Sequence, residues 1–304
     1  MNGSEDKERH GKPEIPIVLA HGIAPFDAAY RPLLNAGLRK ILVAFGQPPD
    51  TFDYFKGIAS HLRHHGYTVY APRVSFATDV QQRAAILKDR ICGILDSAET
   101  DKVHIIAHSM GGLDARHMIV KGDMADRVAT LTTISTPHLG TSLADIGLKE
   151  MGGLIDLLAK LKIDIKGFRN LSTEKTKVFN QQALDAEAQN PVHYITYTAD
   201  QDYDQIFTPL KISWKIINSV EGSNDGLVSL RSAAWTPQLG AKVVHQESFP
   251  IPADHLNQIG WWDIDELHSI DGWPHQVWKQ IGLFEKTIKS AYLKMARDAE
   301  RMVA

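Results

Sequence analysis

An apolar segment that ends abruptly at a serine constrains the fold of this 304-residue chain more than any other feature. Residues 103–107 are largely apolar, Ser109 follows two positions later, and residues 113–120 are compatible with a helix. We interpret this pattern as a strand, a tight turn and a helix, with a hydroxyl at the turn. Such a turn strains the serine backbone, so the residues two positions to either side must be small, and they are Ala107 and Gly111. The hydroxyl would then stand clear of the sheet at a helix N-terminus, which favours developing negative charge.

Apolar runs alternate with helical patterns along most of the chain. The expected strands cover residues 15–20, 67–74, 103–107, 128–135, 192–198 and 242–249. The expected helices cover about 52–65, 79–98, 111–121 and 174–187, followed by a terminal helix with apolar residues at helical spacing from Val277 to Met295. This alternation predicts an α/β fold, with a mostly parallel central sheet and helices on both of its faces.

Composition and charge argue against several classes of function. The net charge of −3 gives no electrostatic case for binding nucleic acid. The single cysteine, Cys92, excludes an intrachain disulfide and a cysteine-rich zinc site, and we expect it in the core. No apolar run approaches the roughly 18 residues of a membrane span, so we expect no transmembrane anchoring.

The first residues are polar and charged. Residues 1–13 lack the apolar region of a secretory signal, so we expect a disordered leader there. A single domain is expected to follow over residues 14–304. Localisation stays open between the cytoplasm and export by a route without a cleavable signal.

Residues 142–170 interrupt the alternation of strands and helices. Met151, Leu154, Ile155 and Leu158 fall on one helical face, and the charged residues fall largely elsewhere. One interpretation is an ordinary amphipathic surface helix. The other is a mobile lid whose apolar underside covers a substrate site, with these four residues in contact with substrate.

A serine hydroxyl is a poor nucleophile unless a base removes its proton, and the base needs an orienting acid. On a parallel sheet these groups come from loops at the carboxyl ends of strands. Asp225 lies in a polar loop beside a glycine, and His255 follows the expected strand 242–249. We therefore expect Ser109 as nucleophile, Asp225 as acid and His255 as base. The rival acids are Asp200, Asp202, Asp204 and Asp254.

A tetrahedral intermediate also needs N–H donors for its oxyanion. One donor is expected from Met110, directly after the nucleophile. The other is expected from Ile23, because an early apolar strand ends at His21-Gly22 and a glycine lets the backbone approach closely. We assign His21, Gly22 and His108 to the substrate site. His108 is a poor candidate for the base, because side chains of neighbouring residues at a sharp turn point apart.

Together these residues resemble the bacterial triacylglycerol lipases of the α/β-hydrolase fold, the group that includes the Pseudomonas, Burkholderia and Proteus enzymes. The similarity runs from about Pro16 to His255. The residues that carry it are 21–23, 107–112, 135–141, 170–174, 179–180, 224–228 and 254–256.

The resemblance implies hydrolysis of carboxylic esters through an acyl-enzyme, with a lipid or other ester as substrate. It also implies that segment 142–170 is a lid that engages a lipid–water interface. No cofactor is implied for the chemistry. A structural calcium ion near the catalytic histidine is implied, with Asn257 and either Asp204 or Asp202 as ligands. Asn257 stands where the family has an aspartate, and a neutral ligand weakens such a site.

Three other functions stay open at this point. The protein could be a carboxylesterase without interfacial activation, or an acyltransferase that uses the same residues on the same scaffold. The third alternative is a non-catalytic α/β-hydrolase that serves as a binding module. The apparently complete triad argues against the last of these.

Overall fold

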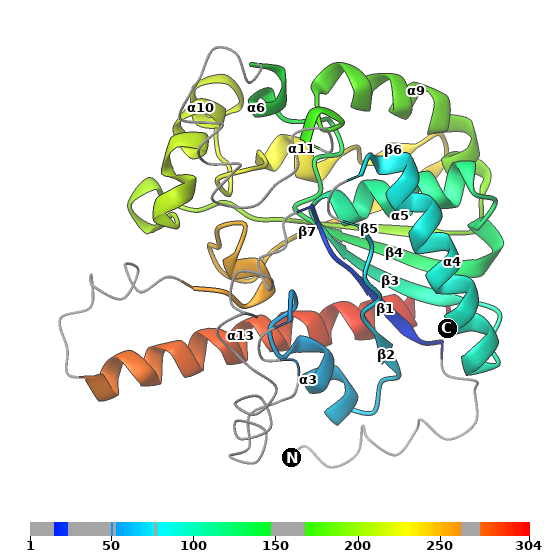
Figure 1. Cartoon of the computed structure of the whole chain (residues 1–304), viewed down its shortest axis with the longest axis horizontal. Helices are drawn as coiled ribbons and strands as arrows, with labels where there is room; N and C mark the ends of the chain where they lie inside the picture. The colour runs from blue at the N-terminus through cyan, green and yellow to red at the C-terminus, as the bar shows by residue number, and fades with distance from the viewer. Residues whose placement is uncertain (1–14, 24–49, 51–52, 76–77, 147–167, 263–273) are drawn as a thin grey trace.

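The computed structural model describes residues 15–23, 50, 53–75, 78–146, 168–262 and 274–304. Within them a seven-stranded sheet has the strand order β2-β1-β3-β4-β5-β7-β6 (Figure 1). All neighbouring strands are parallel except β6, which runs antiparallel to β7. The strands are β1 (Ile17–Ala20), β2 (Val69–Tyr70), β3 (Val103–His108), β4 (Val128–Ile134), β5 (His193–Thr198), β6 (Gln238–Leu239) and β7 (Lys242–Ser248).

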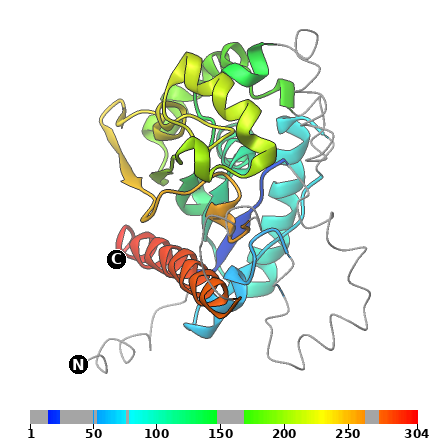
Figure 2. The same ribbon diagram turned by 90° about the vertical axis from the view of Figure 1, so that its left-hand side faces the viewer.

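Helices connect the strands and cover the sheet on both faces. They are α3 (Ile58–His64), α4 (Val80–Ala98), α5 (Met110–Lys121), α6 (Ser142–Asp145), α9 (Thr173–Gln189), α10 (Lys211–Glu221), α11 (Leu230–Ala234) and α13 (Pro274–Arg301). The long terminal helix α13 lies on the opposite face of the sheet from α4 and α5 (Figures 1 and 2). The expected mostly parallel sheet with helices on both faces is therefore confirmed.

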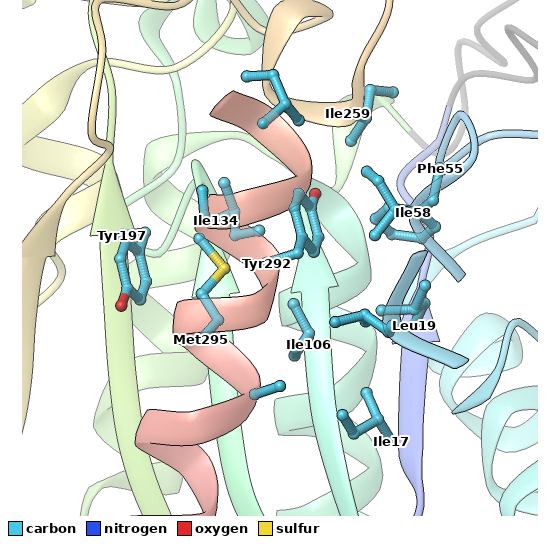
Figure 3. Close-up of a cluster of buried hydrophobic side chains, with 14 of the residues drawn as sticks. Ile17, Leu19, Phe55, Ile58, Ile106, Ile134, Tyr197, Ile259, Tyr292 and Met295 are labelled. Atoms are coloured by element: carbon cyan, nitrogen blue, oxygen red, sulfur yellow. The ribbon is translucent and has the colours of Figure 1, made fainter. Parts of the chain in front are cut away.

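The core is divided between the two faces of the sheet. On one face α3 and α13 pack against the strands, and Tyr292 and Met295 of α13 lie over Ile106 and Ile134 (Figure 3). On the other face the apolar sides of α4 and α5 cover alternate residues of the same strands. This alternation explains why β3 and β4 are buried along their whole length.

Side chains cap the first turns of two helices. The Asp79 side chain accepts a hydrogen bond from Gln82 N–H at the start of α4, and Ser172 accepts one from Lys175 N–H at the start of α9. Several boundaries differ from the sequence-based expectation. The strand expected over 67–74 is limited to Val69–Tyr70, and the helix expected over 52–65 begins only at Ile58.

The register of β1 on β3 places the functional segments side by side. Ile17 pairs with His104, and three residues later Ala20 pairs with Ala107. Because both strands run in the same direction, the residues that follow them emerge at the same edge of the sheet. The segment that begins at His21 and the turn at Ser109 therefore meet at the carboxyl ends of the central strands.

Candidate active site

Ser109 adopts a backbone conformation that residues other than glycine rarely take. Its φ is 56° and its ψ is −135°. Hydrogen bonds hold this turn in place. Ser109 N–H donates to Ile134 O at 2.9 Å, and Ser109 O accepts from Thr136 Oγ1 at 2.8 Å and from Gly112 N–H at 3.0 Å. The strand–turn–helix expected from the sequence therefore exists, and the surrounding fold stabilises its strained residue.

Two glycines allow close contact between this turn and the loop after β1. A Cβ atom on Gly111 would lie 2.5 Å from Ala20 O and 2.7 Å from His21 O. A Cβ atom on Gly22 would lie 2.9 Å from Ser109 Cβ and 3.2 Å from its Oγ. Neither position has room for a side chain. The small residue expected at 111 is thus required by the backbone of a neighbouring strand.

Asp225 and His255 form a buried pair. His255 Nδ1 lies 2.7 Å from Asp225 Oδ2, and the two side chains are 2% and 0% exposed. The other carboxylate oxygen of Asp225 accepts hydrogen bonds from Leu227 N–H at 3.0 Å and Val228 N–H at 2.8 Å. Burial alone would raise the pKa of Asp225, but the charge and hydrogen bond of His255 and the further donors hold it below its ordinary value. The carboxylate therefore stays ionised beside the imidazole.

His255 lies next to the strand that carries the serine. Its ring packs against the ring of His108, with the centroids 4.5 Å apart. Because His108 directly precedes Ser109, the fold brings Ser109, His255 and Asp225, the expected nucleophile, base and acid, to the same end of β3. In Figure 1 the loop after β7, drawn in orange, lies at the end of the sheet toward which β1 runs.

The rival acids do not take the place of Asp225 beside this imidazole. Asp254 is buried, but its carboxylate accepts from the N–H groups of Leu256, Asn257 and Phe207 at 2.8–2.9 Å. Burial raises its pKa to about 6 despite these donors. Asp254 therefore stabilises the loop around His255. Of the other rivals, Asp202 and Asp204 are exposed.

The two expected oxyanion donors each follow a residue of the turn region: Met110 follows Ser109, and Ile23 follows Gly22, whose added Cβ would lie 2.9 Å from Ser109 Cβ. Met110 is the first residue of α5, and the first N–H groups of a helix have no acceptor within the helix. Ile23 is buried in the loop after β1. Arg83 stabilises this loop, because its Nη2 donates to His21 O at 3.0 Å and to Gly22 O at 3.2 Å.

Arg83 also connects the loop to the helix behind the nucleophile. It is completely buried on α4, and its guanidinium forms an ion pair with Asp114 of α5 at 2.7 Å. Nothing in the local sequence marks Arg83, because it reads as one polar position in an amphipathic helix. Its contact with the loop depends on the packing of α4 beside β1, which sequence analysis alone does not supply.

Two residues assigned to the substrate site are buried histidines with structural contacts. His21 Nε2 accepts from Val74 N–H at 3.0 Å, and burial together with the Arg83 charge lowers the pKa of His21 to about 3. His108 is fully buried, and its Nδ1 lies 2.8 Å from Tyr54 Oη. Both rings are neutral at ordinary pH, and both lie beneath the surface of the site.

An apolar cluster includes the two residues expected to donate to the oxyanion. Ile23 and Met110 belong to it, together with residues from α6, α10 and the loop after His255. The other buried members are Val80, Leu113, Leu143, Phe168, Leu171, Ile206, Leu210, Ile217 and Leu256. The expected lid residues Met151, Leu154, Ile155 and Leu158 lie outside the described residues, and so does the expected leader 1–13.

The expected calcium ligands do not form a site with the required donors. Asn257 Oδ1 accepts from Asp254 N–H at 3.2 Å, and Asn257 Nδ2 donates to Trp261 O at 3.0 Å. Asp204 lies exposed in a short 3₁₀ helix, Tyr203–Gln205. Among the described residues, no three His, Cys, Asp or Glu side chains group in a way that could hold a metal ion. Calcium prefers several charged oxygens, so this donor set does not fit it.

Comparison with known proteins agrees with this arrangement. Residues 66–154 match the family described as PGAP1-like alpha/beta domain. The chain is 28% identical to Triacylglycerol lipase 2 of Saccharomyces cerevisiae, over 95% of this chain and 92% of the yeast protein. It is 32% identical to a triacylglycerol lipase of Burkholderia plantarii, over 43% of this chain and 31% of that lipase.

Solved structures with the same architecture include two ester hydrolases. A metagenomic carboxyl esterase superposes with a TM-score of 0.62 and 16% identity, covering 95% of this chain and 77% of the esterase. The mature lipase of Bacillus licheniformis superposes with a TM-score of 0.58 and 21% identity, covering 82% of this chain and 88% of the lipase. The strand order and these likenesses establish that the chain has the α/β-hydrolase fold.

Proposed function

We propose that this protein is a serine hydrolase that cleaves carboxylic esters through an acyl-enzyme, and that its substrates are triacylglycerols. The observation that carries the proposal is the buried Asp225–His255 pair, 2.7 Å between Nδ1 and Oδ2, beside a serine at φ 56°. A buried carboxylate and a strained backbone each reduce the free energy of unfolding, and such features cluster at functional sites.

The contacts of these residues define the steps. Asp225 accepts the Nδ1 proton of His255, so the neutral imidazole presents Nε2 as its basic atom. Nε2 takes the proton of Ser109 as Oγ attacks the acyl carbonyl. The N–H groups of Met110 and Ile23 stabilise the oxyanion. His255 then gives the proton to the leaving alcohol, and later activates the water that releases the acid.

Triacylglycerol as the substrate rests on the sequence relatives. The yeast lipase matches almost the whole chain, and the Burkholderia lipase matches a region of less than half of it. The shared motifs also support our proposal that the chain is akin to the Pseudomonas and Burkholderia group. We further propose one α/β-hydrolase domain with a lid within 142–170 that opens at a lipid–water interface. Among the described residues, no helix is long and apolar enough to cross a bilayer.

Replacement of the nucleophile tests the reaction type. We expect Ser109→Ala to lose at least about 10³-fold in hydrolysis of p-nitrophenyl butyrate, because the attacking atom is removed. Thermal unfolding should show that the variant still folds. A Ser109→Ala protein with the wild-type rate would reject the proposed reaction.

Substrate concentration tests the lid. Tributyrin hydrolysis should rise abruptly once the ester exceeds its solubility and forms droplets. A rate that saturates smoothly through that concentration would indicate an esterase without interfacial activation. Added alcohol acceptors, with the products separated by chromatography, distinguish hydrolysis from acyl transfer.

A further inference from the structure

The carboxylate of Asp225 has a second side-chain donor on the same oxygen that receives His255. Gln258 Nε2 donates to Asp225 Oδ2 at 2.9 Å, beside the 2.7 Å contact of His255 Nδ1. Gln258 is 0% exposed and lies in the 3₁₀ turn Asn257–Ile259, directly after the histidine. An amide can be rotated by 180°, and in that orientation its oxygen would face the carboxylate and repel it. The function of this contact therefore depends on what orients the Gln258 amide.

His108 is the neighbouring group that could supply that orientation. Its Nε2 and the Oε1 of Gln258 are both buried, and neither atom forms a hydrogen bond in the part of the chain that the structure describes. One atom can donate and the other can only accept. The Gln258 side chain and the carbonyl of His255 are the hydrogen-bonding groups that oppose the strong lowering of the His108 pKa by burial and by His255. His108 is therefore neutral, and our proposal below places its single proton on Nε2.

The contact with Tyr54 is compatible with this placement of the proton. Its hydroxyl lies 2.8 Å from His108 Nδ1, so with the proton on Nε2 the tyrosine donates to Nδ1. In the proposed chain of donors, Tyr54 donates to His108, His108 donates to Gln258, and Gln258 donates to Asp225; the first and last of these contacts measure 2.8 Å and 2.9 Å. Each member is 6% exposed or less. Every hydrogen bond in this chain points toward the carboxylate.

We propose that Gln258, oriented by His108 and Tyr54, is a positioning residue that holds the Asp225 carboxylate in place for His255. This role rests on the proposed hydrolase function. Gln258 touches no reacting atom. It shares the charge of Oδ2 with His255 and fixes the plane of the carboxylate, so that the imidazole keeps the direction needed for attack by Ser109. The titratable groups within or facing this network are His21, Tyr54, His108, Asp225, Asp254, His255 and Tyr292.

Gln258→Met tests the proposal, because methionine keeps the length of the side chain and removes the amide. Without the shared donor, Oδ2 pairs with His255 alone and favours its protonated form. We expect kcat on p-nitrophenyl butyrate to fall about tenfold, as for loss of a hydrogen bond to a charged group, with KM within about twofold. The acid limb of the kcat/KM pH profile should shift to higher pH. A merely structural contact would not move this limb.

A double-mutant cycle tests the role of His108. His108→Phe should shift the acid limb in the same direction, and His108→Phe/Gln258→Met should be no slower than Gln258→Met, because both changes break one chain. His104→Phe is the matched control. It removes another buried imidazole of β3, whose partner is Thr130 rather than the triad, and should leave kcat and the pH profile unchanged.

The outcomes separate this proposal from the hydrolase assignment. A wild-type kcat and an unshifted acid limb in Gln258→Met, or fully additive losses in the double variant, would overturn the positioning role while the hydrolase assignment stands. Activity that survives in Ser109→Ala would overturn the hydrolase assignment itself. If Gln258→Met does not fold, Gln258→Leu is measured against the same two criteria.

Discussion

At the scale of single residues, the site requires two positions without a side chain as well as the residues expected to carry out the reaction. Ser109 can stand in its strained turn beside the loop after β1 because Gly22 and Gly111 carry no side chain there. The buried acid–base pair supplies the chemistry, and these two glycines supply the space in which it can act.

Gly22→Ala tests this requirement for space. The added methyl group would lie 2.7 Å from Tyr54 Oη and 2.9 Å from Ser109 Cβ, so the loop that carries the Ile23 N–H must move. We expect kcat to fall by about 10²-fold, as for removal of one oxyanion donor, while the protein still folds. Gly93→Ala, in α4 with nothing within 4 Å of the added Cβ, is the control. Steady-state kinetics on a soluble ester would measure both, and equal rates in the two variants would contradict the expectation.

The residues found from sequence are those with a local signal. Ser109 between small neighbours, His21-Gly22 at the end of an apolar run and His255 after the last long strand could each be identified in this way. The choice of Asp225 over Asp254 was a hypothesis, because it depends on which carboxylate faces the ring. Gln258 and Tyr54 gave no signal, since their roles arise from contacts between segments far apart in the chain.

At the scale of elements, one buried arginine on α4 forms hydrogen bonds with the loop after β1 and an ion pair with α5. Arg83 of α4 bonds the carbonyls of the loop after β1 and pairs with Asp114 of α5, the helix that begins at the nucleophile. The positions of both expected oxyanion donors therefore depend on how α4 and α5 pack. The sequence predicted both helices closely, but it could not show that they are joined by an ion pair beneath the active site.

Arg83→Leu should lower the free energy of unfolding by about 3–5 kcal/mol, because it leaves a buried carboxylate without its partner. The double variant Arg83→Leu/Asp114→Leu should regain much of this loss, but not the activity, since the loop carbonyls still lack their donor. Chemical denaturation measures the first effect and kinetics the second. Arg127→Met, at an exposed pair with Asp101, serves as the control and should change little. Full activity in Arg83→Leu would contradict the link to the oxyanion loop.

At the scale of the whole molecule, the fold could be predicted from the alternation of apolar strands and helical patterns. The elements that the prediction missed are those that depend on packing against the rest of the molecule. The central strands β3 and β4 were predicted because apolar residues make up more than half of each segment, and both strands are buried along their whole length. The helix α10 and the short strand β6 were not, because α10 has an exposed apolar side and β6 has two residues. Each of these two elements therefore depends on packing against neighbouring elements.

Buried neutral histidines make the stability of the whole molecule sensitive to acid. Burial lowers the pKa of His104 from 6.5 to about 4, so the unfolded chain binds a proton between these values that the folded chain does not. Stability from this group is present above pH 6.5 and is lost as pH falls toward 4. The difference in unfolding free energy between wild type and His104→Phe should therefore shrink by about 2 kcal/mol from pH 7 to pH 5. Urea unfolding at the two pH values measures this change, and a constant difference would mean that His104 binds its proton equally well in the folded and the unfolded chain.

The central claim is that the Ser109 hydroxyl is made nucleophilic by His255 and Asp225. The most direct measurement is treatment of the folded protein with a fluorophosphonate, followed by peptide mass spectrometry. We expect one adduct on the peptide that contains Ser109, and labelling slowed by orders of magnitude in a folded His255→Ala variant. Modification of another residue, or labelling of His255→Ala at the wild-type rate, would contradict the account.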